Sequence, residues 1–286
     1  MKTIVITGAT SGIGFETAKL LATKSFRIIG IGRNETRCTR AKAAILAAVP
    51  DAEVTYFTAD LMQQREVNHV AAVLTDYIIS SCGGQLFALI NNAGCARGRY
   101  MTTEDGYEQQ FALNYLAGFL LTYRLLPLLR AANGRVIMTG SQSHKGSRVH
   151  WNDVMLSRHY NPLTAYKQSK LCSTIFAKGL NDRFAQLGVH AYVVDPGLVR
   201  TDIGNKDAGG LVNLVWSLRK LGGISPEIPA RTYACLCEAQ DAPSGLYYYL
   251  CRERAYSCKV TRENADRLFA LSEQLCGISY KGVNGI

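Results

Sequence analysis

The sequence predicts a single doubly wound α/β domain with a mainly parallel sheet flanked by helices. In its first half, short apolar runs of strand length alternate with longer amphipathic segments. That alternation is typical of parallel strands joined by crossover helices on both faces of a sheet. We find no linker and no internal repeat, so residues 1–286 are assigned to one domain.

The predicted elements follow one another along the whole chain. Strands are short runs rich in β-branched and aromatic residues, and helices have apolar residues at helical spacing. The predicted strands are 4–7, 26–32, 53–60, 86–92, 135–140, 189–195 and 245–250. The predicted helices are 12–24, 35–48, 63–80, 104–131, 163–187, 229–239 and 262–276. Two irregular stretches, 142–162 and 198–225, follow strands and are expected to form loops over a binding site.

The bulk composition indicates a globular chain with a sizeable core, because 48% of its residues are hydrophobic. The formal charge is +10, but the basic residues are dispersed, so nucleic acid is not an expected partner. No window has the ~18 uninterrupted apolar residues of a membrane span. A strand begins by residue 3, which leaves no room for a signal peptide or anchor. We therefore expect a cytoplasmic protein without a membrane span.

Cysteine and histidine spacing predicts neither a disulfide framework nor a metal site. The nine cysteines contain no CxxC pair. The close pair Cys235 and Cys237 is interpreted as two buried thiols. Four residues of one loop also lack metal-ligand spacing: His144, His150, Asp153 and His159.

A glycine-rich turn follows the first predicted strand. In TGATSGIG (7–14), Gly8, Gly12 and Gly14 permit a tight turn and close approach of the backbone to a pyrophosphate. The following helix N-terminus offers free N–H groups to the same anion. A merely structural turn is the alternative, but the strand–turn–helix setting favours nucleotide binding and a Rossmann-type domain.

The end of the second strand bears on which dinucleotide binds. NAD-specific domains place an acidic residue about 20 positions beyond the glycines, and an arginine there suits the 2′-phosphate of NADP. Here Gly32 occupies the acidic position and Arg33 follows it. A solvent-facing arginine is the alternative. Because arginine forks readily onto phosphate oxygens, NADP(H) is favoured over NAD(H).

A tyrosine and a lysine lie one helical turn apart in AYKQSKL (165–171). Residues i and i+4 share a helix face, so the Lys170 ammonium is expected within electrostatic reach of Tyr166. A cation there favours phenolate over phenol and makes the pair suitable for acid–base chemistry. A surface contact is the alternative for such a pair taken alone.

With the glycine turn, NNAG (91–94) and Tyr166-x-x-x-Lys170, the sequence resembles the short-chain dehydrogenase/reductase family. The segments TSGIGFETAKLLA, EDGYEQQFALNYLAGFLLT and DPGLVRTDI are similar to its retinol dehydrogenase-like branch. The resemblance covers nearly the whole chain.

The resemblance implies the catalytic set Asn114, Ser141, Tyr166 and Lys170. Tyr166 would supply the proton, Ser141 would orient the carbonyl, and Lys170 would also bond the nicotinamide ribose. Asn114 would anchor a water on the proton path. Because this chain has Ser141-Gln142-Ser143 in place of adjacent serines, Ser143 remains the alternative to Ser141.

The resemblance also implies contacts for cofactor and substrate. The cofactor set, in which Asp60 would hold the adenine amino group, is Gly8, Ser11, Gly12, Ile13, Gly14, Arg33, Asp60, Leu61, Asn91, Ala93, Gly94, Tyr166, Lys170, Pro196, Gly197 and Thr201. The substrate set is Ser141, Trp151, Met155 and Tyr166. The apolar members are expected from the sequence of the two loops, 142–162 and 198–225, that cover the cleft, and the second loop adds Leu211, Leu214, Val215 and Trp216 as further wall candidates. For the apolar residues, packing of a loop onto the body is the alternative.

The predicted function is NADP(H)-dependent interconversion of a lipophilic carbonyl, such as a retinal-, steroid- or xenobiotic-like aldehyde or ketone, and its alcohol. The alternative is a catalytically silent sensor or scaffold that binds NADP(H). Relatives often pair through the helices corresponding to 104–131 and 163–187, so a homodimer is a further expectation.

Overall fold

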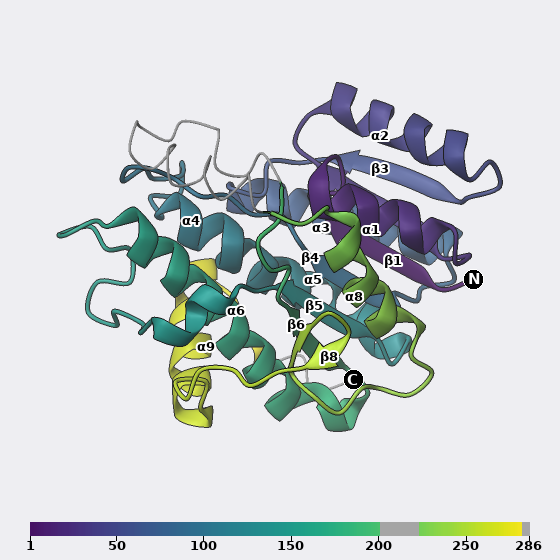
Figure 1. Ribbon diagram of the computed structural model, residues 1–286. Helices are drawn as coiled ribbons and strands as arrows, with labels where there is room; N and C mark the ends of the chain where they lie inside the picture. The colour runs from purple at the N-terminus through teal and green to yellow at the C-terminus, as the bar shows by residue number, and fades with distance from the viewer. Residues whose placement is uncertain (201–222, 282–286) are drawn as a thin grey trace.

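The computed structural model describes residues 1–200 and 223–281, and within them eight strands form one sheet (Figure 1). The strand order is β3-β2-β1-β4-β5-β6-β7-β8, parallel except for the last pair, which confirms the predicted fold class. The strands are β1 (Thr3–Thr7), β2 (Arg27–Gly32), β3 (Val54–Thr58), β4 (Ala88–Asn91), β5 (Arg135–Thr139), β6 (His190–Val194), β7 (Tyr247–Tyr249) and β8 (Arg252–Glu253).

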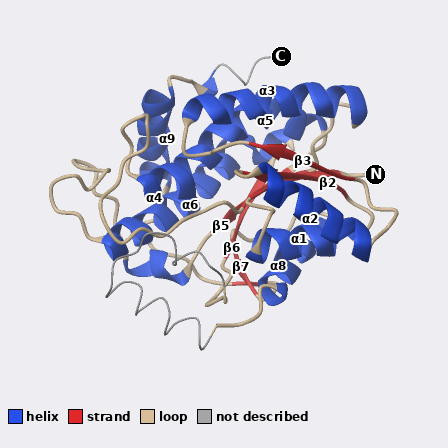
Figure 2. Cartoon of the chain, turned by 90° about the horizontal axis from the view of Figure 1, so that it is seen from above, coloured by secondary structure: helices blue, strands red, loops and turns tan. Residues whose placement is uncertain are grey.

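Helices cover both faces of this sheet (Figure 2). One face carries α3 (Gln64–Ser81), α5 (Ala117–Ala131) and α6 (Pro162–Phe184), and α9 (Arg262–Cys276) packs against α6. The other face carries α1 (Gly12–Ala22), α2 (Glu35–Ala48) and α8 (Glu227–Glu238). Short pieces complete the list: α4 (Gln109–Phe111), the π-helical turn η1 (Ala112–Leu116), and the 3₁₀ turns η2 (Gln142–Gly146) and η3 (Ala185–Leu187).

Two apolar cores follow from the alternation of side chains along the strands. Val5 and Val136 belong to the core under α3, α5 and α6. Their neighbours Ile4, Ile6 and Ile137 belong to the core under α1 and α8. Because the strands are buried on both faces, they are continuous apolar runs in the sequence, as parallel strands usually are.

The strand order reverses at β1, which pairs with β2 on one side and β4 on the other. In such sheets ligands bind beyond the carboxyl ends of the strands, at this switch point. The glycine turn follows β1, NNAG follows β4, and Ser141 follows β5. The fold therefore gathers the predicted site residues at the carboxyl ends of the parallel strands, which we call the carboxyl edge of the sheet.

The helix predicted over 104–131 differs from the structure in two ways. It begins only at Gln109, because the Glu108 carboxylate accepts the Phe111 N–H at 2.7 Å and caps the helix there. It also contains the π-helical turn Ala112–Leu116, an irregularity frequent at functional sites. Apolar spacing does not register either feature.

The helical segment Gln109–Ala131 is long and apolar enough to cross a membrane by length and composition alone. In the structure 72% of its apolar window is buried. A helix that is apolar on all sides is also typical of the interior of a large domain. Here the apolar surface of this segment packs in the core beneath α3, α6 and α9.

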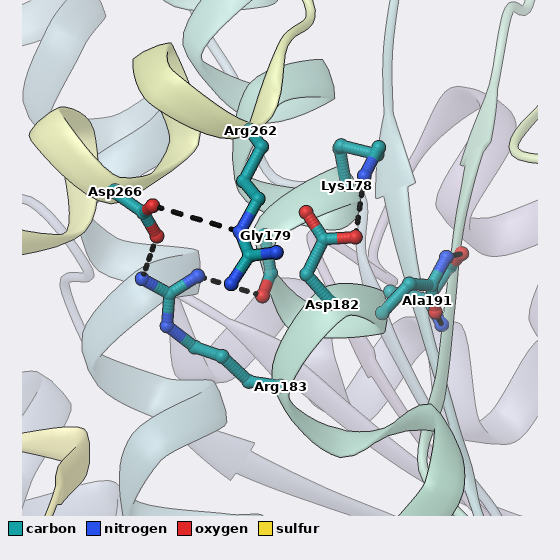
Figure 3. A network of polar contacts seen from close by, with 8 residues as sticks. Lys178, Gly179, Asp182, Arg183, Ala191, Arg262 and Asp266 are labelled. Atoms are coloured by element: carbon teal, nitrogen blue, oxygen red, sulfur yellow. Dashed lines mark hydrogen bonds and ion pairs between the residues drawn. The ribbon is translucent and has the colours of Figure 1, made fainter.

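The outer face of α6 is covered by α9. Arg183 of α6 pairs with Asp266 of α9 at 2.6 Å, as Figure 3 shows. The Tyr115 hydroxyl of η1 lies 2.6 Å from that of Ser272 of α9. Tyr280, which follows α9, donates to the carbonyl of Phe119 in α5 at 2.8 Å. Part of the surface that a dimer through these helices would use is thus occupied within the monomer, and the dimer stays a prediction.

The expectation for Cys235 is wrong, whereas that for Cys237 is confirmed. Cys235 on α8 is exposed and forms a disulfide with Cys251, which follows β7. Cys237 is a fully buried thiol. On a helix these two side chains point in different directions, so one reaches a partner that is distant in sequence. A pairing of this kind has no spacing signature.

Gly179 determines how closely α9 approaches α6, since an added Cβ would lie 2.6 Å from the Phe269 ring. We expect Gly179→Ala to lower the free energy of unfolding by about 1–3 kcal/mol, because overpacking displaces α9. Urea denaturation measures the change. Gly146→Ala is the control, because an added Cβ there meets nothing within 4 Å. Equal stability of the two variants would contradict the close packing.

Candidate active site

The phosphate end of the site is the turn between β1 and α1. Gly8 and Gly12 have φ of 67° and 55°, a region open mainly to glycine. An added Cβ on Gly14 would lie 2.4 Å from the Gly8 carbonyl oxygen, so the turn closes only without side chains. No acidic residue stands in the first turn of α1. The turn therefore fits a pyrophosphate at a positive helix end.

A hydrogen-bonded tie joins this turn to the loop after β4. The Thr7 hydroxyl accepts the N–H groups of Asn92 and Ala93, both at 2.9 Å. The Asn92 amide donates back to the Thr7 carbonyl at 3.0 Å. Neither Thr7 nor Asn92 was singled out from the sequence, although Asn92 lies within NNAG. The tie makes the glycine turn and the NNAG loop one rigid unit.

The tyrosine and lysine of α6 lie as their spacing predicts. The Lys170 ammonium is 5.7 Å from the centre of the Tyr166 ring. It donates to the carbonyl of Thr139, the last residue of β5, at 2.8 Å. Tyr166 is half-buried, whereas Lys170 is only 3% exposed. The ammonium is thus fixed below a tyrosine that remains accessible.

Burial lowers the pKa of Lys170 to about 8, and the negative charge of Asp195 opposes this effect. A lysine with this pKa is still mostly protonated at neutral pH. It can therefore support a phenolate on Tyr166 under physiological conditions.

Ser141 is held in place by the turn that it begins. Its backbone is extended, and its hydroxyl oxygen accepts from the Ser143 hydroxyl at 3.0 Å. Ser143 thus donates to Ser141, which leaves the Ser141 proton available to another acceptor. This direction favours Ser141 as the residue that meets a substrate, and the choice between the serines stays a prediction.

His144 links Ser141 to the C-terminal part of the chain. Its Nδ1 lies 2.7 Å from the Ser141 carbonyl, and its Nε2 accepts the Ser257 N–H at 3.1 Å. A carbonyl only accepts, so Nδ1 carries the proton and the ring is neutral. The ring is fully buried. Its position, three residues after Ser141, was visible in the sequence, but its partner Ser257 was not.

Asn114 lies in the π-helical turn and joins the NNAG loop to α6. Its Oδ1 accepts the Cys95 N–H at 2.7 Å, and its amide donates to the Cys95 carbonyl and the Ser169 hydroxyl, both at 3.0 Å. The side chain is therefore a structural bridge beside the lysine. Its role as the anchor of a water stays a prediction.

The predicted cofactor residues lie along the same edge of the sheet. Ser11, Ile13 and Gly14 begin α1, Asp60 and Leu61 follow β3, and Asn91, Ala93 and Gly94 end β4 or follow it. Arg33 is exposed after β2, and Pro196 and Gly197 follow β6. Thr201 lies outside the described residues, as do Leu211, Leu214, Val215 and Trp216.

The 142–162 loop packs onto the body through the two residues predicted to line the substrate cleft. The Arg267 guanidinium of α9 lies 4.5 Å from the centre of a Trp151 ring. The Met155 sulfur accepts the Glu108 N–H at 3.4 Å. These contacts correspond to the packing alternative, and the substrate contacts of Trp151 and Met155 stay predictions.

Fold and site together define an oxidoreductase that binds a dinucleotide at the carboxyl ends of its parallel strands, where Tyr166 and Lys170 share one face of α6. The sequence pattern of short chain dehydrogenases matches residues 2–209. This chain belongs to the short-chain dehydrogenase/reductase family, within its retinol dehydrogenase-like branch. Enzymes of the family act on alcohols and carbonyls with a nicotinamide cofactor.

Similar proteins support the same placement. Retinol dehydrogenase 13 from Homo sapiens is 34% identical over 99% of this chain and 86% of its own length. Polyprenol dehydrogenase from Homo sapiens is 34% identical over 70% of this chain and 61% of its own length. The crystal structure of an uncharacterized protein from Mycobacterium Paratuberculosis has a TM-score of 0.73 at 27% identity, covering 98% of this chain and 95% of that one.

The buried neutral His144 makes stability depend on pH. Burial lowers its pKa from the ordinary 6.5, so the unfolded chain takes up a proton more readily than the folded one. The free energy of unfolding should therefore fall as pH drops below about 6.5, toward the folded-state pKa. We expect His144→Gln to show a shallower fall in melting temperature between pH 8 and 5. His190 is present in both proteins, so an identical slope would exclude His144 as the cause.

Proposed function

We propose that the protein is an NADP(H)-dependent oxidoreductase that reduces a lipophilic carbonyl, with Tyr166 as the proton donor. The observation that carries the proposal is the buried Lys170 ammonium, held by the Thr139 carbonyl and 5.7 Å from the centre of the Tyr166 ring. A silent sensor would have no need to bury a cation beneath an accessible tyrosine.

Each polar group of the site has a task in the reaction. A bound NADPH supplies the hydride, and negative charge then develops on the substrate oxygen. Tyr166 donates a proton to that oxygen, and Lys170 stabilises the resulting phenolate. The Ser141 hydroxyl, whose oxygen accepts a hydrogen bond from Ser143, donates its own proton to the substrate oxygen and orients it. Asn114 keeps the NNAG loop in register with α6.

The preference for NADP rests on the end of β2. An added Cβ on Gly32 would lie 2.4 Å from the Thr10 methyl group and 2.7 Å from the Cys38 sulfur. An acidic side chain that binds ribose hydroxyls would therefore have to displace Thr10 and Cys38 at this position. The next residue, Arg33, is exposed and offers a cation to a 2′-phosphate.

A lipophilic substrate is supported by the names of two relatives, retinol dehydrogenase 13 and polyprenol dehydrogenase. The 142–162 loop carries the apolar side chains Trp151, Val154 and Met155, which are only partly buried against the core. We propose that their remaining surface contacts such a substrate. We propose a cytoplasmic enzyme that works mainly as a reductase, because NADPH is abundant in reducing compartments. Turnover found only with NAD⁺ and an alcohol would contradict both the cofactor and the direction.

Replacement of the proton donor tests the mechanism. We expect Tyr166→Phe to lower kcat for carbonyl reduction by about 10²- to 10⁴-fold, the usual contribution of general acid catalysis. NADPH affinity, followed by fluorescence titration, should change little. Tyr77→Phe removes a comparable hydroxyl, 3.0 Å from that of Thr55 on the edge strand β3, and should keep wild-type kcat. Full activity of the Tyr166 variant would favour a non-catalytic protein.

Cofactor preference has a separate test. We expect Arg33→Ala to weaken NADPH binding by about 10- to 100-fold, the loss typical of a charge-assisted hydrogen bond, and to leave NADH binding unchanged. Arg65→Ala, which removes an exposed arginine of α3, is the charge-matched control. A parallel loss for both cofactors, or no loss for either, would remove Arg33 from the phosphate site.

A further inference from the structure

Asp195 is a buried acidic residue that immediately follows β6, at the edge of the sheet where the site lies. It is only 2% exposed. Its Oδ1 accepts the Gly197 N–H at 2.9 Å. Its Oδ2 and the hydroxyl of Tyr247, which faces this carboxylate, are both buried without a hydrogen bond of normal geometry among the described residues. An unsatisfied carboxylate oxygen is costly in the interior unless an opposite charge compensates it.

The register of the sheet brings this carboxylate to the catalytic lysine. Lys170 donates to the Thr139 carbonyl, and Thr139 pairs with Val194 in the adjacent strand. Asp195 is the residue after Val194. The ammonium and the carboxylate thus occupy the ends of neighbouring parallel strands, both shielded from water.

We propose that Asp195 is a positioning residue for the reaction, the buried counter-ion that keeps Lys170 charged beneath Tyr166. The catalytic part of this inference rests on the proposed function of Tyr166 and Lys170. The electrostatic attraction between the two groups does not, because it concerns only the stability of two buried charges.

The other groups around the lysine cannot replace this counter-ion. The Cys95 thiol also faces Lys170, but burial raises its pKa to about 12, so it carries no charge at neutral pH. On the side of Asp195, burial raises the pKa values of Tyr233 and Tyr247 and lowers that of His144, so all three are neutral. Among these groups Asp195 is left as the anion.

The Asp195 charge affects the protonation of Lys170 and, through it, the chemistry of Tyr166. Burial lowers the pKa of Lys170 to about 8, and the Asp195 charge opposes that effect. Without Asp195 the pKa would fall further, and the lysine would lose its proton within the working pH range. The neutral amine could no longer stabilise a phenolate on Tyr166.

The kinetic test is Asp195→Asn, which keeps the shape and the acceptor for Gly197. The alkaline limb of kcat for carbonyl reduction reports the coupled Tyr166–Lys170 pair. We expect this limb to move to lower pH by about 1 unit or more, with a loss of about 10-fold or more at pH 8. Asp182→Asn removes the same charge from α6, where Asp182 pairs with Lys178 (Figure 3), and should leave the limb in place.

A second test needs no turnover. Urea unfolding is compared among the wild type, Asp195→Asn, Lys170→Met and the variant with both replacements. If the charges compensate each other, each single replacement destabilises the fold, and the double variant recovers stability relative to Asp195→Asn. This comparison also decides the case in which the Asn variant folds poorly.

An unmoved alkaline limb in a folded Asp195→Asn variant would overturn the proposal. So would a double variant no more stable than the Asn variant alone. A wild-type protein without reductase activity would instead remove the proposed function, while the unfolding comparison would still decide whether the two buried charges stabilise each other.

Discussion

The site depends on one constraint, the placement of a cation where water cannot reach it. Lys170 is only 3% exposed, and its ammonium donates a hydrogen bond to the carbonyl of Thr139. Such a charge is tolerable only if the surrounding backbone and side chains hold it firmly. The position of α6 and the end of β5 hold that one ammonium.

The parallel sheet supplies the precision that this placement requires. Three adjacent strands end with Asn91, Thr139 and Val194, and the residues that follow them bear the polar groups of the site. Strand register fixes these ends relative to one another, and the Asn114 bridge then fixes α6 against the loop after β4. The geometry of the site thus comes from backbone hydrogen bonds more than from flexible side chains.

The sequence was informative wherever a signal is local. Periodicity predicted the sheet and its helices, glycine positions predicted the phosphate turn, and helical spacing predicted the proximity of Tyr166 and Lys170. The sequence was uninformative where two residues in contact lie far apart along the chain. The Cys235–Cys251 disulfide and the contact of His144 with Ser257 join residues 16 and 113 positions apart. The π-helical turn escaped prediction because apolar spacing barely changes when one residue is inserted into a turn.

The aromatic cluster beneath α9 has a consequence for how the protein is made. Phe119 of α5 and Phe176 of α6 pack against Phe269 and Tyr280, which are synthesised about 100 residues after α6 begins. Until these late residues leave the ribosome, the rings of Phe119 and Phe176 remain exposed on the growing chain, whereas α9 buries them in the finished protein. Exposed apolar surface makes an incomplete chain prone to aggregation, and premature termination before residue 262 would leave this surface uncovered.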